Sequence, residues 1–98
     1  MSTVETIRFH LREGVEDADF QVLNRTVEDE YMAKRPGFVS RTTARSADGE
    51  YLVTVHWETV EAAEATIGQF FGAPETQGFL GAVDVSTVQS GRYELVPH

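Results

Sequence analysis

Residues 48–57 read DGEYLVTVHW, which joins a turn signal to a strongly alternating strand. Asp-Gly is the strongest short-range signal of a β-hairpin, because both central positions of a type I′ turn need positive φ. After the turn, apolar and polar side chains alternate up to Glu58, as they do in a strand with one buried face. The sequence therefore predicts a strand over 51–58, joined by a two-residue turn at Asp48-Gly49 to a strand over 38–45.

On both sides of this hairpin, the sequence contains further segments with the helical period and further segments with the period of two of a strand. Apolar residues spaced by three and four positions indicate a first helix, capped by Asp17 and ended by Pro36-Gly37. A second helix is capped by Thr59 and ends at Gly72. The expected elements are a strand at 4–11, the first helix, strands at 38–45 and 51–58, a helix at 60–71, a short helical piece around Phe79 and Leu80, and a strand at 83–96 with a bulge or bend at Gly91.

The order of these elements is β-α-β-β-α-β, which is typical of an α+β, ferredoxin-like fold. Right-handed crossovers place the first and third strands in the middle of a four-stranded antiparallel sheet, with two helices on one face. The helices should cover the face that carries Phe9, Val53 and Trp57. The other face mixes Val39 and Leu52 with polar side chains, and is expected to pack on a second copy of the chain.

Length, charge and cysteine content restrict the class of protein. The chain has 98 residues, a net charge of −8 and no cysteine. One domain over residues 1–98 is expected. The negative charge argues against nucleic acid and anionic membranes as partners. The lack of cysteine excludes disulfides and thiol catalysis, and no apolar run is long enough to span a membrane. A soluble, cytoplasmic domain is therefore expected.

Three segments, taken in order, resemble a known family. They are Pro36-Gly37-Phe38, the run from Val55 to Thr59 (VHWET) that leads into an Ala/Glu-rich helix, and the run from Asp84 to Thr87 that begins the last strand. Together they resemble the antibiotic-biosynthesis-monooxygenase-like proteins of the dimeric α/β-barrel superfamily. The resemblance implies a homodimer whose two sheets form a closed barrel. It also implies a family of cofactor-independent quinol oxygenases, haem-degrading enzymes, ring-cleavage isomerases and members without known activity.

Two departures from that family bear on the cofactor. The oxygenase and haem-degrading branches use an active-site Asn, whereas Asn24, the one Asn here, falls on the first predicted helix. The haem-degrading branch also uses a His on or near the second helix, and residues 61–81 contain none. Haem degradation is therefore disfavoured, the assignment as a quinol oxygenase is weakened, and no cofactor is expected.

One group of polar residues is predicted on the sheet face away from the helices. A two-residue turn at Asp48-Gly49 places Arg41 opposite His56, and Arg8 shares their face. Neighbouring positive charge lowers the pKa of a His and favours a neutral general base, while guanidinium groups bind carboxylate or enolate oxygens. His56 and Arg41 are thus candidate catalytic residues, with Arg8 as a binding residue. The alternative is that the arginines form ion pairs that hold the dimer together.

A second candidate site is predicted between the sheet and the helices. Trp57, Tyr31, Ser40 and Thr42 would line it, and the small side chains of the 38–45 strand would leave space. Flat aromatic or polyketide-like ligands are what the resemblance implies for such a pocket. The alternative for Trp57 is a core position, with its indole N–H bound to one acceptor.

A metal site is not expected. His10 and His56 share a face but lie roughly 13 Å apart, at about 3.3 Å per residue of strand, and His98 is the terminal residue. Two functions remain open. The first is a small-molecule enzyme that carries out cofactor-free oxidation or isomerisation of a phenolic or enolic substrate. The second is a homodimer that binds a small molecule, or has a structural role, without catalysis.

Overall fold

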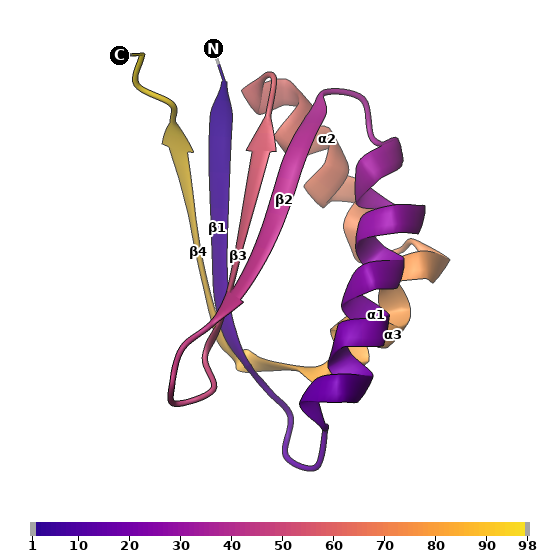
Figure 1. Cartoon of the computed structure of the whole chain (residues 1–98). Helices are drawn as coiled ribbons and strands as arrows, with labels where there is room; N and C mark the ends of the chain where they lie inside the picture. The colour runs from indigo at the N-terminus through magenta and orange to yellow at the C-terminus, as the bar shows by residue number, and fades with distance from the viewer. Residues whose placement is uncertain (1, 98) are drawn as a thin grey trace.

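A computed structural model describes residues 2–97 and confirms the predicted α+β arrangement (Figure 1). The sheet is antiparallel with strand order β2-β3-β1-β4, so β1 and β3 occupy the centre as predicted. His98 lies outside the described residues. The elements are β1 (Thr3–Leu11), α1 (Asp17–Glu30), η1 (Met32–Lys34), β2 (Phe38–Arg45), β3 (Tyr51–Trp57), α2 (Val60–Phe70), η2 (Pro74–Thr76), α3 (Gln77–Ala82) and β4 (Val83–Glu94).

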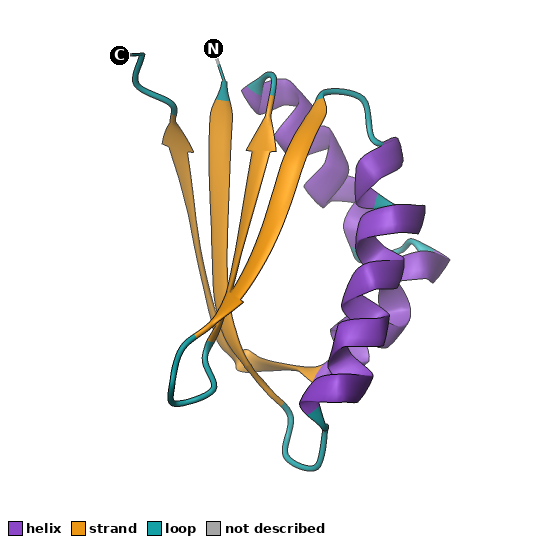
Figure 2. Ribbon diagram, in the orientation of Figure 1, coloured by secondary structure: helices purple, strands orange, loops and turns teal. Residues whose placement is uncertain are grey.

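All three α-helices lie on one face of the sheet and leave the other face open (Figure 2). Thr59 caps α2 as predicted, since its hydroxyl accepts a hydrogen bond from Ala62 N at 3.1 Å. The prediction that Asp17 caps α1 is wrong, because the N-cap is Glu16. Asp17 is instead the first helical residue, and its carboxylate accepts hydrogen bonds from Arg45 and Tyr51. Within residues 2–97, no helix has the length and apolar character needed to cross a membrane.

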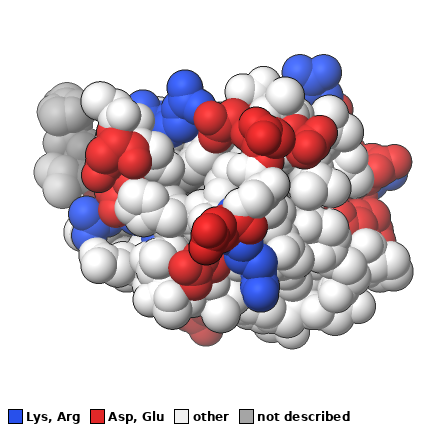
Figure 3. Space-filling model, turned by 90° about the horizontal axis from the view of Figure 1, so that it is seen from below, with Lys and Arg blue, Asp and Glu red and all other residues white. Residues whose placement is uncertain are grey.

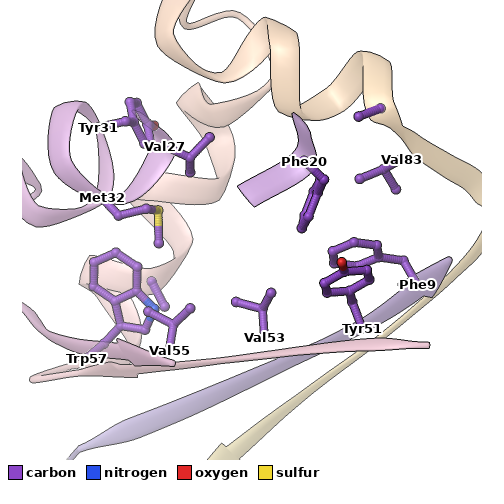
Figure 4. Close-up of a cluster of buried hydrophobic side chains, with 12 residues drawn as sticks. Phe9, Phe20, Val27, Tyr31, Met32, Tyr51, Val53, Val55, Trp57 and Val83 are labelled. Atoms are coloured by element: carbon purple, nitrogen blue, oxygen red, sulfur yellow. The ribbon is translucent and has the colours of Figure 1, made fainter. Parts of the chain in front are cut away.

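The core lies between the sheet and the helices, and aromatic rings make up much of it (Figure 4). The Phe9 ring stacks on Tyr51 with centroids 5.7 Å apart, and its edge meets Phe20 at 5.8 Å. Trp57 is fully buried further along β3, beside Phe38. Its indole Nε1 donates to Glu5 Oε1 at 3.0 Å. The structure thus places Trp57 in the core with one acceptor, which is the alternative considered for it above.

The β2–β3 hairpin differs from its prediction. Its loop runs from Ser46 to Glu50, with Gly49 N donating to Ser46 O and Ser46 N donating to Glu50 O. Gly49 has a φ of 92°, whereas no non-glycine residue of 2–97 has positive φ, so Asp48 does not meet the demand of a type I′ turn. This is the longer hairpin loop in which a type I turn precedes a left-handed glycine. The predicted two-residue turn is therefore wrong.

The longer loop shifts the register of β2 against β3 by one residue. Arg41 pairs with Val55, and Ser40 pairs with His56, after an irregularity between Phe38 and Ser40. A shift of one residue turns every side chain of a strand to the other face. Arg41 therefore points to the helices, and Ser40 and Thr42 point to the open face.

Strand β4 also departs from expectation. The predicted bulge or bend at Gly91 is wrong, because Gly91 pairs regularly with Thr6. The register instead jumps between Arg8, which pairs with Gln89, and His10, which pairs with Asp84. The bulged segment between these pairs is held by side chains: Thr87 Oγ1 accepts from His10 N at 2.9 Å, and Asp84 Oδ1 accepts from Ser86 N at 3.1 Å.

Two glycines allow a matched test of the backbone. Gly37 and Gly49 both have positive φ, at 82° and 92°, where a Cβ costs about 1–2 kcal/mol. A Cβ on Gly37 would also lie 2.6 Å from Ala62 Cβ, whereas one on Gly49 meets nothing within 4 Å. We expect Gly49→Ala to lower the free energy of unfolding by about 1 kcal/mol, and Gly37→Ala to lower it further. Urea denaturation would measure both, and equal losses would contradict the contact with α2.

Candidate functional site

A cavity of about 220 Å³ lies between the sheet and the helices. Its wall is apolar apart from Ser90 and two charged residues, Glu5 and Arg41, which come from different strands. The apolar lining comes from all layers of the fold and comprises Ile7, Phe9, Met32, Val53, Val55, Ile67, Phe70, Phe71, Phe79, Leu80, Val83, Val85 and Val88. Apolar walls with a few placed polar groups are typical of small-molecule sites.

The sheet register places the two charged residues in one row. Arg92 of β4 pairs with Glu5 of β1, Glu5 pairs with Val55 of β3, and Val55 pairs with Arg41 of β2. Directly paired residues point to the same face of a sheet. A carboxylate and a guanidinium therefore face the helices on either side of Val55.

Glu5 is buried but well partnered. Its Oε1 accepts from Trp57 Nε1, and its Oε2 accepts from Arg92 Nε and Nη2 at 3.1 and 2.9 Å. Arg92 Nη1 also lies 3.8 Å from Oε1 of Glu64 on α2. Hydrogen bonds to an ionised group are roughly twice as strong as neutral ones, and they offset much of the cost of burying this carboxylate. Glu5 thus has a structural role in joining β1, β3 and β4.

Arg41 is buried with fewer partners. Its side chain is 3% exposed, yet only Nη2 has a close acceptor, Asn24 Oδ1 at 2.6 Å. Nη1 lies 3.5 Å from Glu28 Oε1, and the guanidinium carbon lies 6.0 Å from the Phe79 ring centre. Burial lowers the pKa of Arg41 and Glu28 partly restores it, but a guanidinium stays charged in proteins. Two of its five N–H donors thus have acceptors, and the other three form no hydrogen bond with any residue from 2 to 97.

A second, more open space lies outside Arg41, between α1 and β2. We call this space the outer groove, and its volume is about 500 Å³. Arg41 is the one residue that lines both the outer groove and the apolar cavity. The other lining residues of the outer groove are Phe20, Gln21, Asn24, Arg25, Glu28, Thr43, Ala44, Arg45 and Tyr51.

Solved structures share the overall fold across nearly the whole chain. SnoaB, a cofactor-independent oxygenase from Streptomyces nogalater, is 21% identical with a TM-score of 0.77, over 99% of this chain and 95% of that one. A Bordetella bronchiseptica protein assigned to the antibiotic biosynthesis monooxygenases is 19% identical with a TM-score of 0.78, over 98% of both chains. The chain has the fold of the antibiotic-biosynthesis-monooxygenase-like proteins. No family model and no curated protein matches the sequence.

On this monooxygenase-like fold, the predicted group of Arg41, His56 and Arg8 does not form. His56 and Arg8 share the open face, where His56 pairs with Val4 and Ser40, and Arg8 donates to Gln89. Arg41 lies on the opposite face, because the β2 register differs by one residue from the prediction. His56 Nε2 is buried without a hydrogen-bond partner among residues 2–97. His56 therefore cannot act on a ligand held by Arg41 of the same subunit.

None of the residues predicted for the sheet–helix pocket lines the cavity. Ser40 and Thr42 lie on the open face, and Trp57 fills the core. Tyr31 is also buried, where its hydroxyl donates to Thr66 O at 2.9 Å and burial raises its pKa. The prediction is therefore wrong in placing Ser40 and Thr42 on the helix side, whereas Trp57 and Tyr31 lie on the predicted side but do not line the cavity. Arg41, predicted for the other face, is at the cavity.

Sequence reasoning missed Glu5, Asn24 and Glu28 as site residues. A signal existed for Glu5, which alternates in phase with Ile7 and Phe9 and so shares their buried face. Asn24 and Glu28 are four residues apart on α1 and lie on one helix face. Their contact with Arg41 depends on the β2 register, which the sequence pattern did not predict.

Proposed function

We propose that this protein binds a flat, mostly apolar phenol or enol in the sheet–helix cavity and holds its deprotonated oxygen on Arg41. The observation that carries the proposal is a buried guanidinium with unused N–H donors at the wall of an apolar cavity. An oxyanion would supply the missing acceptors, and charge-assisted hydrogen bonds are strong in such surroundings. Arg41 would therefore favour the ionised form of a bound phenol.

The reaction we propose is a monooxygenation that needs no cofactor. An ionised phenol is electron-rich at the carbon para to its oxygen, and this carbon can form a bond to O2. The resulting hydroperoxide loses water and leaves a carbonyl, so one oxygen atom stays in the product and the other leaves with two substrate hydrogens. The fold shared with SnoaB, a cofactor-independent oxygenase, supports this choice. The alternative is binding without catalysis, in which the same phenol occupies the cavity unchanged.

The proposal can be tested with 1-naphthol. The cavity of about 220 Å³ is below the usual range of roughly 300–1,000 Å³ for ligand pockets, so a two-ring phenol is a suitable size. We expect saturable binding by calorimetry, and O2 uptake that yields 1,4-naphthoquinone and water in equal amounts. Binding without O2 uptake would favour the non-catalytic alternative. Absence of binding would overturn both.

We also propose that the protein is a cytoplasmic homodimer that packs through the open sheet face. Leu52 is 37% exposed on this face, and the unpartnered Nε2 atom belongs to His56, whose side chain lies on the same face. A partly apolar sheet face that is not covered by helices is a typical site of association. A second copy would bury this face and would supply a hydrogen-bond partner for His56 Nε2.

A charge placed on this face should prevent dimer formation. Leu52→Glu would bury one carboxylate from each subunit, so we expect a monomer at micromolar concentration, where the wild type sediments as a dimer. Val22→Glu is the control, because Val22 is 67% exposed on α1, away from the sheet. A Leu52→Glu dimer as stable as the wild type would show that the interface lies elsewhere.

A further inference from the structure

The outer groove is built from the matching periodicities of a helix and a strand. Gln21, Asn24, Arg25 and Glu28 follow the three- and four-residue spacing of one face of α1. Arg41, Thr43 and Arg45 alternate along β2, so all three point to the helix side. Asn24 of α1 forms hydrogen bonds to two residues of β2. Its Oδ1 accepts from Arg41 Nη2, and its Nδ2 donates to Thr43 Oγ1 at 3.0 Å.

Positive charge gathers in this groove and is only partly neutralised. Of its three arginines, Arg45 is paired with Asp17, and Arg41 has only Glu28 at 3.5 Å. Arg25 forms no ion pair and no side-chain hydrogen bond with any residue from 2 to 97. The chain as a whole carries a net charge of −8, and red exceeds blue on the face drawn in Figure 3. An excess of cations at one groove of such a protein favours an anionic ligand.

The groove and the apolar cavity meet at one side chain. Arg41 lines both, and the rings of Phe20 and Phe79, whose centroids are 5.4 Å apart, lie on the two sides of this boundary. A guanidinium is a planar group that can donate along two edges at once. A ligand held by Arg41 could therefore keep its apolar body in the cavity and extend a neighbouring polar substituent into the groove.

We infer that the outer groove binds a carboxylate carried by the same ligand, next to the oxygen that Arg41 holds. The ligand class is then an aromatic hydroxy acid whose hydroxyl and carboxylate are adjacent, with Arg25 and Arg41 as the cationic partners of the carboxylate. A singly charged, planar carboxylate suits the fork of a guanidinium. Glu28, 41% exposed in the same groove, would repel a doubly charged phosphate more strongly. This inference rests on the proposed phenol site.

Two probes that differ by one carboxylate test it: 1-naphthol and 1-hydroxy-2-naphthoate. We expect the wild type to bind the acid at least fivefold more tightly than the naphthol, with a preference that falls as salt is raised from 20 to 500 mM. Arg25→Ala should weaken binding of the acid about fivefold and leave 1-naphthol within twofold, since exposed ion pairs contribute modestly. Lys34→Ala is the control, because it removes one exposed positive charge outside the groove.

The outcomes separate this inference from the function on which it rests. If 1-naphthol binds but the carboxylate adds no affinity, or Arg25→Ala weakens both probes equally, the groove is not a carboxylate site and the phenol site stands. If the Lys34→Ala and Arg25→Ala variants lose affinity for the acid equally, the effect is long-range charge and the inference is overturned. If neither probe binds to the wild type, the phenol site itself is overturned. Arg25 is exposed, so the Arg25→Ala variant should keep the wild-type melting temperature.

Discussion

Replacement of Arg41 by Met should reduce the affinity for 1-naphthol by about 10- to 100-fold, because hydrogen bonds to a charged group contribute about 1.5–3 kcal/mol. Met keeps the apolar stem of Arg but offers no donor to the phenolate oxygen. Arg41→Lys keeps the charge and loses the planar fork, so its affinity should fall between those of the wild type and Arg41→Met. Calorimetric titration of the three proteins would measure the series.

The same substitution should not destabilise the protein. Arg41 is 3% exposed and has a single close hydrogen bond, so its charge is buried with incomplete compensation. The ion-pair partner that Arg41→Met leaves behind, Glu28, is 41% exposed and can be hydrated, so the variant removes a buried charge without leaving another one buried and unpaired. We therefore expect Arg41→Met to match or exceed the wild type in urea denaturation. A clear loss of stability in Arg41→Met would contradict the incomplete compensation of this buried charge.

His56→Ala provides the control for which face of the sheet holds the ligand. His56 lies on the open face, so its removal should leave 1-naphthol affinity unchanged and should weaken the proposed dimer. The opposite pattern, with binding lost in His56→Ala and kept in Arg41→Met, would place the ligand between the sheets of the dimer.

Trp57→Ala should cause the largest loss of stability, about 3–5 kcal/mol, because it removes a fully buried aromatic side chain and leaves a cavity. It also removes the indole N–H that Glu5 Oε1 accepts at 3.0 Å, so a buried carboxylate oxygen loses its donor. Trp57→Phe keeps most of the volume and loses the hydrogen bond, and should cost about 1–3 kcal/mol. Urea denaturation would rank the variants.

Val22→Ala is the matched control for these substitutions, since Val22 is exposed on α1 and should change stability by less than about 0.5 kcal/mol. The folded Trp57→Phe protein should bind 1-naphthol like the wild type, because Trp57 does not line the cavity. A Trp57→Phe variant of unchanged stability that fails to bind would show that the indole contacts the ligand.

The sequence determined the architecture because the relevant signals are local. Alternation from Tyr51 to Trp57 predicts which side chains of β3 face the helices, and the order of strands and helices leaves few topologies for a sheet of this size. The alternation within β1 identifies Phe9 as a core residue, and the alternation within β3 identifies Val53, and the structure confirms both. These conclusions hold whatever the alignment between neighbouring strands, since each depends on one strand at a time.

Tertiary structure decided the site, because the site depends on how strands align with one another. Both Asp48-Gly49 turn geometries use a glycine with positive φ, so the dipeptide alone did not distinguish a two-residue loop from the longer one. The difference of one residue moved Arg41 from the open face to the cavity, and moved Ser40 and Thr42 in the opposite direction. Because side chains alternate with a period of two, the smallest error in register reverses every assignment on the strand.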